Sequence, residues 1–346
     1  MTETAKWYEK AGSCGDVVVS TRVRLARNLK QYPFPARASA SQREAVERQV
    51  KDALLSGNSI LSKEFRFIPL ENTTQEEAVS LVERHIVSPE FIADRRGKAV
   101  LISADESISI MVNEEDHLRI QVLREGFSLK EAAETADRID TLLSENLDFA
   151  FDPELGYLTQ CPTNLGTGLR ASVMLHLPGL TESGAMPRIA SNLSKLGLTI
   201  RGTYGEGSKS IGALYQLSNQ ITLGLSENEA IENLRSITVQ LMEEERKARA
   251  QMSEEIAWQD KIDRAAGVLK SARVLSSSEF MELLSYIRLG LSIGVLQGVT
   301  TQELNALMVN AQPATLMARA GKQLDETQRD VLRADIAREV CAKIKE

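Results

Sequence analysis

The chain has 346 residues, of which 42% are hydrophobic and 26% are charged, and its formal net charge is −7. This composition is typical of a globular protein of two or three domains, and the acidic balance argues against general nucleic-acid binding. Three widely separated cysteines (Cys14, Cys161 and Cys341) predict no disulfide framework, so a reducing cytoplasmic location is expected. The start lacks the apolar core of a signal peptide and no apolar run could cross a bilayer, so no membrane partner is expected.

Strand patterns dominate the first two-thirds of the chain. Residues 17–28 alternate, which predicts a strand with Val19, Thr21, Val23 and Leu25 on one face and Ser20, Arg22 and Arg24 on the other. Residues 98–112 predict two strands around a turn at 104–107, and further strands are predicted at 117–123, 155–160, 171–177, 198–204 and 212–224. Because several strands follow one another without intervening helices, we expect an α+β fold with a largely antiparallel sheet flanked by helices.

Helical patterns become continuous after residue 225. Capping boxes are predicted at Ser128–Glu131, Ser226–Glu229, Ser276–Glu279 and Thr300–Glu303. Amphipathic stretches at 226–264, 276–291, 300–310 and 325–345 predict an all-helical C-terminal third. We place the boundary near residue 245, which gives an α+β domain at 1–245 and a helical domain at 246–346. The apolar segment 280–296 could be a dimer surface or the core of the helical domain.

Arginine recurs on the predicted sheet, at Arg22, Arg24, Arg119, Arg170 and Arg201. A single arginine on a sheet face is usually solvated or paired across the strands. Converging arginines would repel one another unless polyanionic oxygens lay between them, and guanidinium groups match phosphate oxygens. The sequence has no GxxxxGK[ST] loop, so a nucleotide site here would have to be built differently.

Five segments carry a family resemblance, in the order STRVRLARNLKQYPFP, NEEDHLRI, CPTNLGTGLRASVMLHLPGL, RGTYGEG and LSNQITLG. They resemble the signature blocks of the phosphagen (guanidino) kinases, the creatine and arginine kinase family, and cover residues 15–245. Only nineteen residues precede STRVR, where metabolic members carry a helical domain, and a helical region follows the blocks instead. This arrangement is similar to the bacterial protein arginine kinases, and implies a site open enough for an arginine on a protein.

The resemblance implies roles for individual residues. The arginines at 22, 24, 119, 170 and 201 would hold the phosphates of ATP. Mg²⁺ would bridge phosphate oxygens with few protein ligands, so no metal-binding residue is assigned. His85 would stack on adenine. Glu115, with Asp116 beside it, would orient the acceptor guanidinium and take its proton, because a protonated guanidinium is a poor nucleophile. Cys161, as a thiolate, would pair with the same guanidinium.

One departure from the family pattern lies in RGTYGEGSK. Metabolic relatives carry a second arginine where this chain has Tyr204, and a guanidinium-binding glutamate where it has Lys209. A lysine there should repel a cationic acceptor. Either Glu206 takes the carboxylate role, or Lys209 points away, or acceptor binding is impaired.

The segment RDVLRA (329–334) resembles the phosphoarginine-binding segment of the protein arginine kinases. The resemblance implies an allosteric site in which Arg329 and Arg333 hold the phosphoryl group and Asp330 pairs with the guanidinium. The other interpretation is a solvated, charged helix face.

The leading hypothesis is an ATP-dependent kinase that phosphorylates arginine side chains of proteins. The alternatives are a small-molecule guanidino kinase and a catalytically impaired phosphoarginine-binding protein, which Lys209 would favour. By resemblance, the expected protein substrates include a stress-response repressor and damaged proteins marked for proteolysis. A Clp-type chaperone-protease and an activator protein are the other expected partners. A homodimer formed through the helical domain is also expected.

Overall fold

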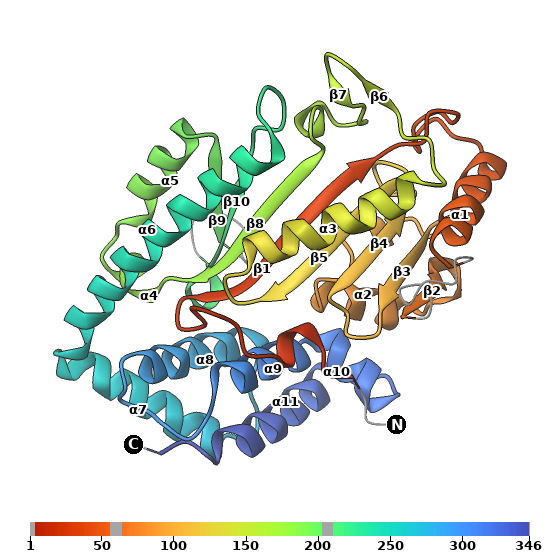
Figure 1. The fold of residues 1–346 in the computed structure, drawn as a ribbon. Helices are drawn as coiled ribbons and strands as arrows, with labels where there is room; N and C mark the ends of the chain where they lie inside the picture. Colours follow the sequence, from red (N-terminus) through yellow and green to blue (C-terminus); the bar gives the residue numbers. More distant parts are fainter. Residues whose placement is uncertain (1–3, 56–63, 203–209, 346) are drawn as a thin grey trace.

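The structure is a computed structural model that describes residues 4–55, 64–202 and 210–345 (Figure 1). Its main sheet has eight strands: β1 (Val18–Arg27), β2 (Phe65–Pro69), β3 (Ala99–Ser103), β4 (Ile108–Val112), β5 (Leu118–Glu125), β8 (Leu169–His176), β9 (Leu198–Gly202) and β10 (Leu214–Asn219). A separate hairpin consists of β6 (Phe151–Asp152) and β7 (Gly156–Tyr157).

All neighbouring strands of the main sheet are antiparallel, in the order β2–β3–β4–β5–β1–β8–β10–β9. Strands form where the side chains alternate between two environments. On β5, for example, Leu118, Ile120 and Val122 are fully buried in the core cluster under the helices. The α+β prediction is therefore confirmed.

The helices divide into two groups. Those beside the sheet are α1 (Ala40–Leu55), α2 (Gln75–Glu83), α3 (Leu129–Ser144), α4 (Pro178–Glu182), α5 (Met186–Lys195) and α6 (Glu227–Ser253). The C-terminal group comprises α7 (Ile256–Ser271), α8 (Ser277–Ser292), α9 (Thr301–Asn310), α10 (Pro313–Ala320) and α11 (Glu326–Cys341). Figure 1 shows α3 and α6 crossing one face of the sheet, with the C-terminal group below it.

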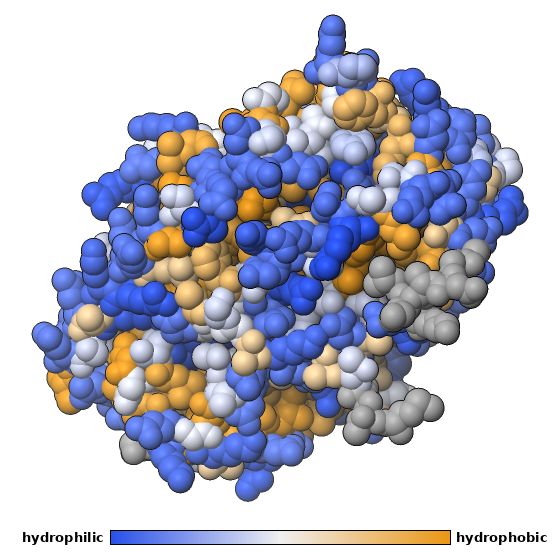
Figure 2. Space-filling view, in the orientation of Figure 1, coloured by the Kyte–Doolittle hydropathy of each residue, from blue (hydrophilic) through white to orange (hydrophobic). Residues whose placement is uncertain are grey.

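Two large apolar clusters stabilise these layers. In the first, Val23 and Leu25 of β1 pack with residues of α1, α3 and α6, so these helices cover one face of the sheet. In the second, the C-terminal helices pack around Phe280, Leu284 and Ile287. Segment 280–296 therefore contributes the core of the helical region. Figure 2 shows a mostly hydrophilic face with apolar patches over the helical part.

Two attachments join the helical region to the sheet. Met174 and Leu214 belong to the second apolar cluster although they lie on β8 and β10. At the other end, the Glu83 carboxylate of α2 accepts hydrogen bonds from the N–H groups of Ala314 (2.9 Å) and Thr315 (2.7 Å). These N–H groups lie in the first turn of α10, so Glu83 satisfies donors that the helix itself leaves free.

Several local predictions were wrong. Val19 does not share a face with Val23: it packs in the second cluster, because the β1–β8 register shifts between Val18 and Ser20. Ser128 does not form the predicted capping box, since its hydroxyl donates to the Glu125 carbonyl (3.0 Å). The strand predicted at 155–160 is only the two-residue β7, and the strand predicted at 212–224 is shortened to β10.

The capping boxes at Ser226 and Thr300 are confirmed, and Ser276 also caps its helix by accepting from the Glu279 N–H. The predicted helix to residue 264 is interrupted, because α6 ends at Ser253 and α7 begins at Ile256. Since α6 continues through residue 245, the division into 1–245 and 246–346 stays a prediction.

Candidate active site

Strand register places the five predicted arginines on one face of the sheet. Arg24 of β1 lies directly opposite Arg170 of β8, and Ala26 lies opposite Arg119 of β5. Residues directly opposite in antiparallel strands share a face. On the outer strand pair, Arg201 lies opposite Gln216, whose side chain accepts a 2.6 Å hydrogen bond from Arg22 Nη2. This face is opposite to the one covered by α3 and α6.

Three of these arginines surround a pocket of about 140 Å³. Its lining consists of Arg24, Ala26, Glu115, Arg119, Cys161, Thr163, Asn164, Gly168 and Arg170. The lining residues come from β1, β5, β8, the β4–β5 turn and the loop before β8. Residues far apart in the sequence thus meet because neighbouring strands bring them together.

The guanidinium groups of the pocket are held close to one another. Burial, followed by the charges of Arg22, Arg119 and Arg170, holds the pKa of Arg24 well below its usual range. Burial likewise lowers the pKa of Arg170, although Cys161 opposes the shift. Arg24 Nε and Arg170 Nε are buried and have no hydrogen-bond partner. The pocket nevertheless gathers three guanidinium groups, those of Arg24, Arg119 and Arg170, and this cluster of positive charge fits a ligand with anionic oxygens.

Glu115 and Cys161 form the other wall of the pocket. Both side chains line the pocket, and Cys161 Sγ lies 3.0 Å from Thr163 Oγ1. Glu115 Oε2 also accepts from Arg119 Nη2 (3.3 Å). Burial and then the neighbouring Asp116 raise the pKa of Glu115. A carboxylate and a thiol therefore face the arginines within one small pocket.

Asp116 occupies a different position from its neighbour. It is 1% exposed and does not line the pocket. Its Oδ1 accepts from Asn28 Nδ2 (2.7 Å) and from the backbone N–H of Gln160 (2.8 Å), the residue before Cys161. Burial raises its pKa. This geometry makes Asp116 a positioning residue that joins the β4–β5 turn to the Cys161 loop.

The loop from Cys161 to Gly168 requires its glycines. Gly166 has φ +107°, and a Cβ there would lie 2.2 Å from the carbonyl oxygen of Thr222. Gly168 has φ +65°, and its Cβ would lie 2.7 Å from the Ala26 carbonyl oxygen. Any side chain at either position would clash with backbone. The glycines therefore let the loop pack closely enough to bring Cys161 beside Arg170.

Arg22 and His85 lie in an adjoining hollow that Leu123, Ser172 and Met174 also line. Burial, with a contribution from the Arg22 charge, lowers the pKa of His85 to about 4, so the ring is neutral at pH 7. Arg201 is exposed and lines neither of these two cavities, although its charge contributes to the lowered pKa of Arg170.

The predicted phosphoarginine residues lie on α11, away from the pocket. Arg333 is 1% exposed, and its guanidinium donates to the carbonyls of Ala311 (2.9 Å) and Leu275 (2.7 Å) and to Asp330. Arg329 and Asp330 are partly exposed. The solvated-face interpretation is therefore wrong for Arg333, whose donors are used within the helical region. Glu206, Tyr204 and Lys209 lie outside the described residues.

Sequence reasoning did not assign a role to Glu114. Its carboxylate pairs with Arg119 Nε (2.8 Å) and Nη1 (2.9 Å) and accepts a hydrogen bond from Ser88. Glu114 thereby sets the orientation of the Arg119 guanidinium. The only sequence signal for Glu114 was its position in the segment NEED. That segment does not show which of its three adjacent acidic residues has which role.

Within the described parts of the chain, no group of three or more His, Cys, Asp or Glu side chains is arranged to hold a metal ion. No helix among the described residues has the length and apolar character needed to span a membrane.

Family models match both parts of the chain. The model for the ATP:guanido phosphotransferase C-terminal catalytic domain matches residues 45–248. The model for the protein-arginine kinase McsB C-terminal domain matches residues 255–346.

Similar proteins agree with these matches. The protein-arginine kinase of Moorella thermoacetica is 46% identical over 345 residues, which cover 99% of each chain. That of Clostridium acetobutylicum is 44% identical and covers 96% of this chain and 98% of the relative. The crystal structure of a lombricine kinase superposes with a TM-score of 0.62, 26% identity and coverage of 72% and 73%. A duplicated taurocyamine kinase from Schistosoma mansoni gives a TM-score of 0.60 and 28% identity, over 77% of this chain and 38% of that one. The chain therefore belongs to the protein-arginine kinase family of ATP:guanido phosphotransferases.

Proposed function

We infer that the protein is an ATP-dependent kinase that transfers a phosphoryl group to arginine side chains of proteins. One observation carries this inference: Arg24, Arg119 and Arg170 meet a carboxylate and a thiol, those of Glu115 and Cys161, in a single pocket. Phosphoryl transfer depends mainly on positioning and on stabilising negative charge, and this pocket supplies both.

The arginines form the donor side of the site. Their guanidinium groups would hold the phosphates of ATP, with Arg22 and Arg201 extending the same sheet face towards the rest of the nucleotide. The guanidinium groups of Arg24 and Arg170, which line the pocket, would donate to phosphate oxygens. His85, neutral and beside Arg22, would stack on the adenine.

Mg²⁺ would arrive with ATP, bound largely to phosphate oxygens. It supplies charge neutralisation at the transferred group. The nearby carboxylates Glu114 and Glu115 both interact with Arg119, which fits a metal held mainly by the nucleotide. The residues of the chain position the phosphates around it.

Glu115 and Cys161 form the acceptor side. Glu115 would orient the incoming guanidinium and accept a proton as its nitrogen attacks the phosphorus. Its raised pKa makes it a better proton acceptor than an ordinary glutamate. Cys161 would contact the same guanidinium as an electrostatic partner, without forming a covalent bond. The proposal includes Glu206 as a second carboxylate beside the acceptor guanidinium.

The finer assignments follow the protein-arginine kinase relatives. We propose a cytoplasmic enzyme that acts on proteins marked for Clp-type proteolysis, with an activator protein and a homodimeric assembly. We also propose that Arg329 and Asp330 bind phosphoarginine; the predicted direct contact of Arg333 with the phosphoryl group is wrong, because Arg333 is 1% exposed, and it instead orients Asp330. Because Arg333 has buried structural contacts, Arg329→Gln is the better test variant: it should weaken phosphoarginine binding and leave ATP affinity unchanged.

The substrate class can be tested in two parallel reactions. The purified chain is incubated with Mg-ATP and either an unfolded, arginine-rich protein or free arginine. Phosphoarginine is then located by mass spectrometry under non-acidic handling. Label on protein arginines supports the proposal, and label confined to free arginine would assign the chain to the small-molecule guanidino kinases. If neither is labelled, the transfer function proposed for the isolated chain is wrong.

A further inference from the structure

The turn that carries His85 has a strained backbone. At the end of α2, the N–H of His85 donates to the Val82 carbonyl and the N–H of Ile86 donates to the Leu81 carbonyl, both at 2.9 Å. This pair of hydrogen bonds is typical of a helix end whose next residue has positive φ, a position that glycine usually occupies. The chain has histidine there, at φ +62°. A residue with a Cβ is disfavoured in this conformation, and such strain concentrates at functional sites.

A buried amide of the sheet binds the carbonyls of this turn. Gln121 of β5 is 2% exposed, and its Nε2 donates to the carbonyls of His85 (2.8 Å) and Ile86 (3.0 Å). Ser109 Oγ of β4 lies 3.0 Å from the same nitrogen and donates to the Ile86 carbonyl (2.7 Å). The strained turn is therefore anchored to the sheet through two adjacent carbonyls.

Gln121 lies between the two parts of the proposed nucleotide site. Alternation along β5 puts Arg119, Gln121 and Leu123 on the same face of the sheet. Arg119 lines the arginine pocket, and Leu123 lines the hollow that contains His85. Gln121 lines neither cavity. Any effect of Gln121 on a nucleotide must therefore pass through a neighbouring residue.

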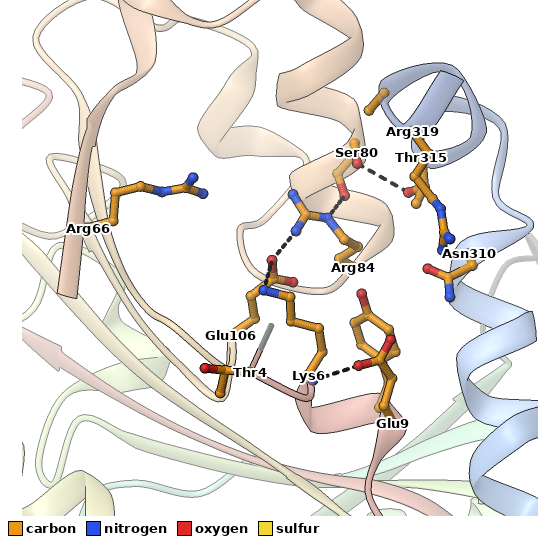
Figure 3. Close-up of a pocket in the computed structure, with 12 residues that line it drawn as sticks. Thr4, Lys6, Glu9, Arg66, Ser80, Arg84, Glu106, Asn310, Thr315 and Arg319 are labelled. Carbon is orange, nitrogen blue, oxygen red and sulfur yellow. Dashed lines mark hydrogen bonds and ion pairs between the residues drawn. The ribbon is translucent and has the colours of Figure 1, made fainter. Parts of the chain in front are cut away.

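The helix before the turn is held by separate contacts (Figure 3). Arg84, the last residue before the turn, pairs with Glu106 and donates to the Ser80 carbonyl (3.4 Å). Ser80 Oγ lies 3.2 Å from Thr315 Oγ1 of α10. Figure 3 shows these side chains where α2 meets α10. They hold α2, and Gln121 holds the two carbonyls that follow it.

We propose that Gln121 is a positioning residue for nucleotide binding, which holds His85 in the backbone conformation from which its ring reaches the nucleotide. This inference rests on the proposed stacking of His85 on adenine. A primary amide suits the task, because it donates to carbonyls without burying a charge. Without the amide, the turn would spend less time in the left-handed conformation. The apparent affinity for ATP falls with the fraction of molecules that hold the binding-competent state.

A double-mutant cycle on the full chain tests this link. The affinity for Mg-ATP is measured by calorimetry for the wild type, Q121M, H85A and Q121M/H85A. Methionine is close to glutamine in size but donates no hydrogen bond. Alanine removes the ring and keeps the Cβ, so the backbone strain at position 85 is retained. A cycle of this kind isolates the coupling between two residues from their separate effects.

Two further variants complete the design. T238V is the matched control, because Thr238 is fully buried in α6 and its hydroxyl donates to the Leu234 carbonyl (2.7 Å). It should bind Mg-ATP like the wild type. Thermal unfolding shows whether each variant is folded. If Q121M does not fold, S109A replaces it in both backgrounds, because it removes the hydroxyl that donates to Ile86.

H85A should weaken Mg-ATP binding, and Q121M should weaken it by about two- to tenfold, as expected for lost hydrogen bonds. In the H85A background, the Q121M substitution should change the affinity by less than about twofold. The kcat of Q121M at saturating ATP should stay close to that of the wild type, because Glu115 and Cys161 are unaltered.

The inference is overturned if Q121M binds Mg-ATP like the wild type. It is also overturned if Q121M weakens binding equally in both backgrounds, which is the result of a merely structural role or of a disturbed Arg119. If H85A alone binds Mg-ATP like the wild type, the stacking of His85 is itself wrong, and the role of Gln121 is rejected with it. The single variants therefore distinguish failure of the proposed nucleotide site from failure of this inference.

Discussion

At the scale of single residues, three consecutive acidic side chains have three different environments. Glu114 orients Arg119, Glu115 faces the pocket, and Asp116 is buried beneath it. The family resemblance of this segment predicted an active-site role for it, and it implied that Glu115 is the residue that takes the proton. The sequence could not separate the other two roles, because they depend on which loops pack against each carboxylate.

Replacing Asp116 by Ala should destabilise the fold. The substitution leaves the N–H of Gln160 without its buried acceptor and removes one acceptor of Asn28. A loss of about 1–3 kcal/mol in the free energy of unfolding is expected. Urea denaturation would measure it, with Glu154→Ala as a control at an exposed site. A stability equal to that of the wild type would show that Asp116 does not position the Cys161 loop.

The pH dependence of transfer should report Glu115. Its pKa is raised by burial and by Asp116, so the carboxylate becomes protonated at a higher pH than an ordinary glutamate does. A proton acceptor must be ionised, and kcat/KM should therefore fall as the pH decreases through this raised value. Initial rates across an acidic series would locate the decline. A profile that stays level into the range of an unperturbed glutamate would argue against Glu115 as the base.

At the scale of elements, alternation and capping patterns predicted most strands and the longer C-terminal helices. Five helices were not predicted: α1, α2, α4, α5 and α10. The patterns worked on β5 and α6, where the local pattern and the tertiary packing agree. They failed at Val19, because a register shift in β1 reverses the direction of a side chain without any mark in the composition. They also failed at Ser128, because its hydroxyl donates to the Glu125 carbonyl and does not cap α3.

This contrast between the two serines can be measured. Ser226 accepts from the Glu229 N–H at the start of α6, whereas Ser128 makes no such bond at the start of α3. Ser226→Ala should therefore lower the free energy of unfolding by about 1 kcal/mol. The change in Ser128→Ala should be smaller, because that variant loses no capping interaction. Equal losses in the two variants would contradict the assignment of the caps.

At the scale of the whole molecule, strand register determines which side chains meet in the active site. The stability of the sheet depends on its packing against the helical region. Alternation along each strand could predict which face an arginine occupies. Only the order β5–β1–β8 explains why Arg119, Arg24 and Arg170 meet. The family resemblance predicted this convergence. The packing of α10 on α2 could not be predicted, because no local sequence pattern indicates it.

A chain that ends at Ser253 should be less stable than the full chain. It would lack α7–α11, which cover the apolar side chains of Val19, Met174 and Leu214. Exposing each of these side chains costs about 1.5–3 kcal/mol. We expect a lower thermal midpoint and self-association, measured by calorimetry and light scattering. A monomeric product with the midpoint of the full chain would show that the two parts are independent.

The most direct test of the account compares the wild type with Glu115→Gln in two measurements on the same samples. Phosphoryl transfer from Mg-ATP to protein arginine is followed by mass spectrometry, and ATP affinity is followed by calorimetry. Loss of a proton acceptor should slow transfer by about 10²–10⁴-fold. ATP affinity should remain close to that of the wild type, because the phosphates contact the arginines instead. Transfer at the wild-type rate in Glu115→Gln would contradict the account.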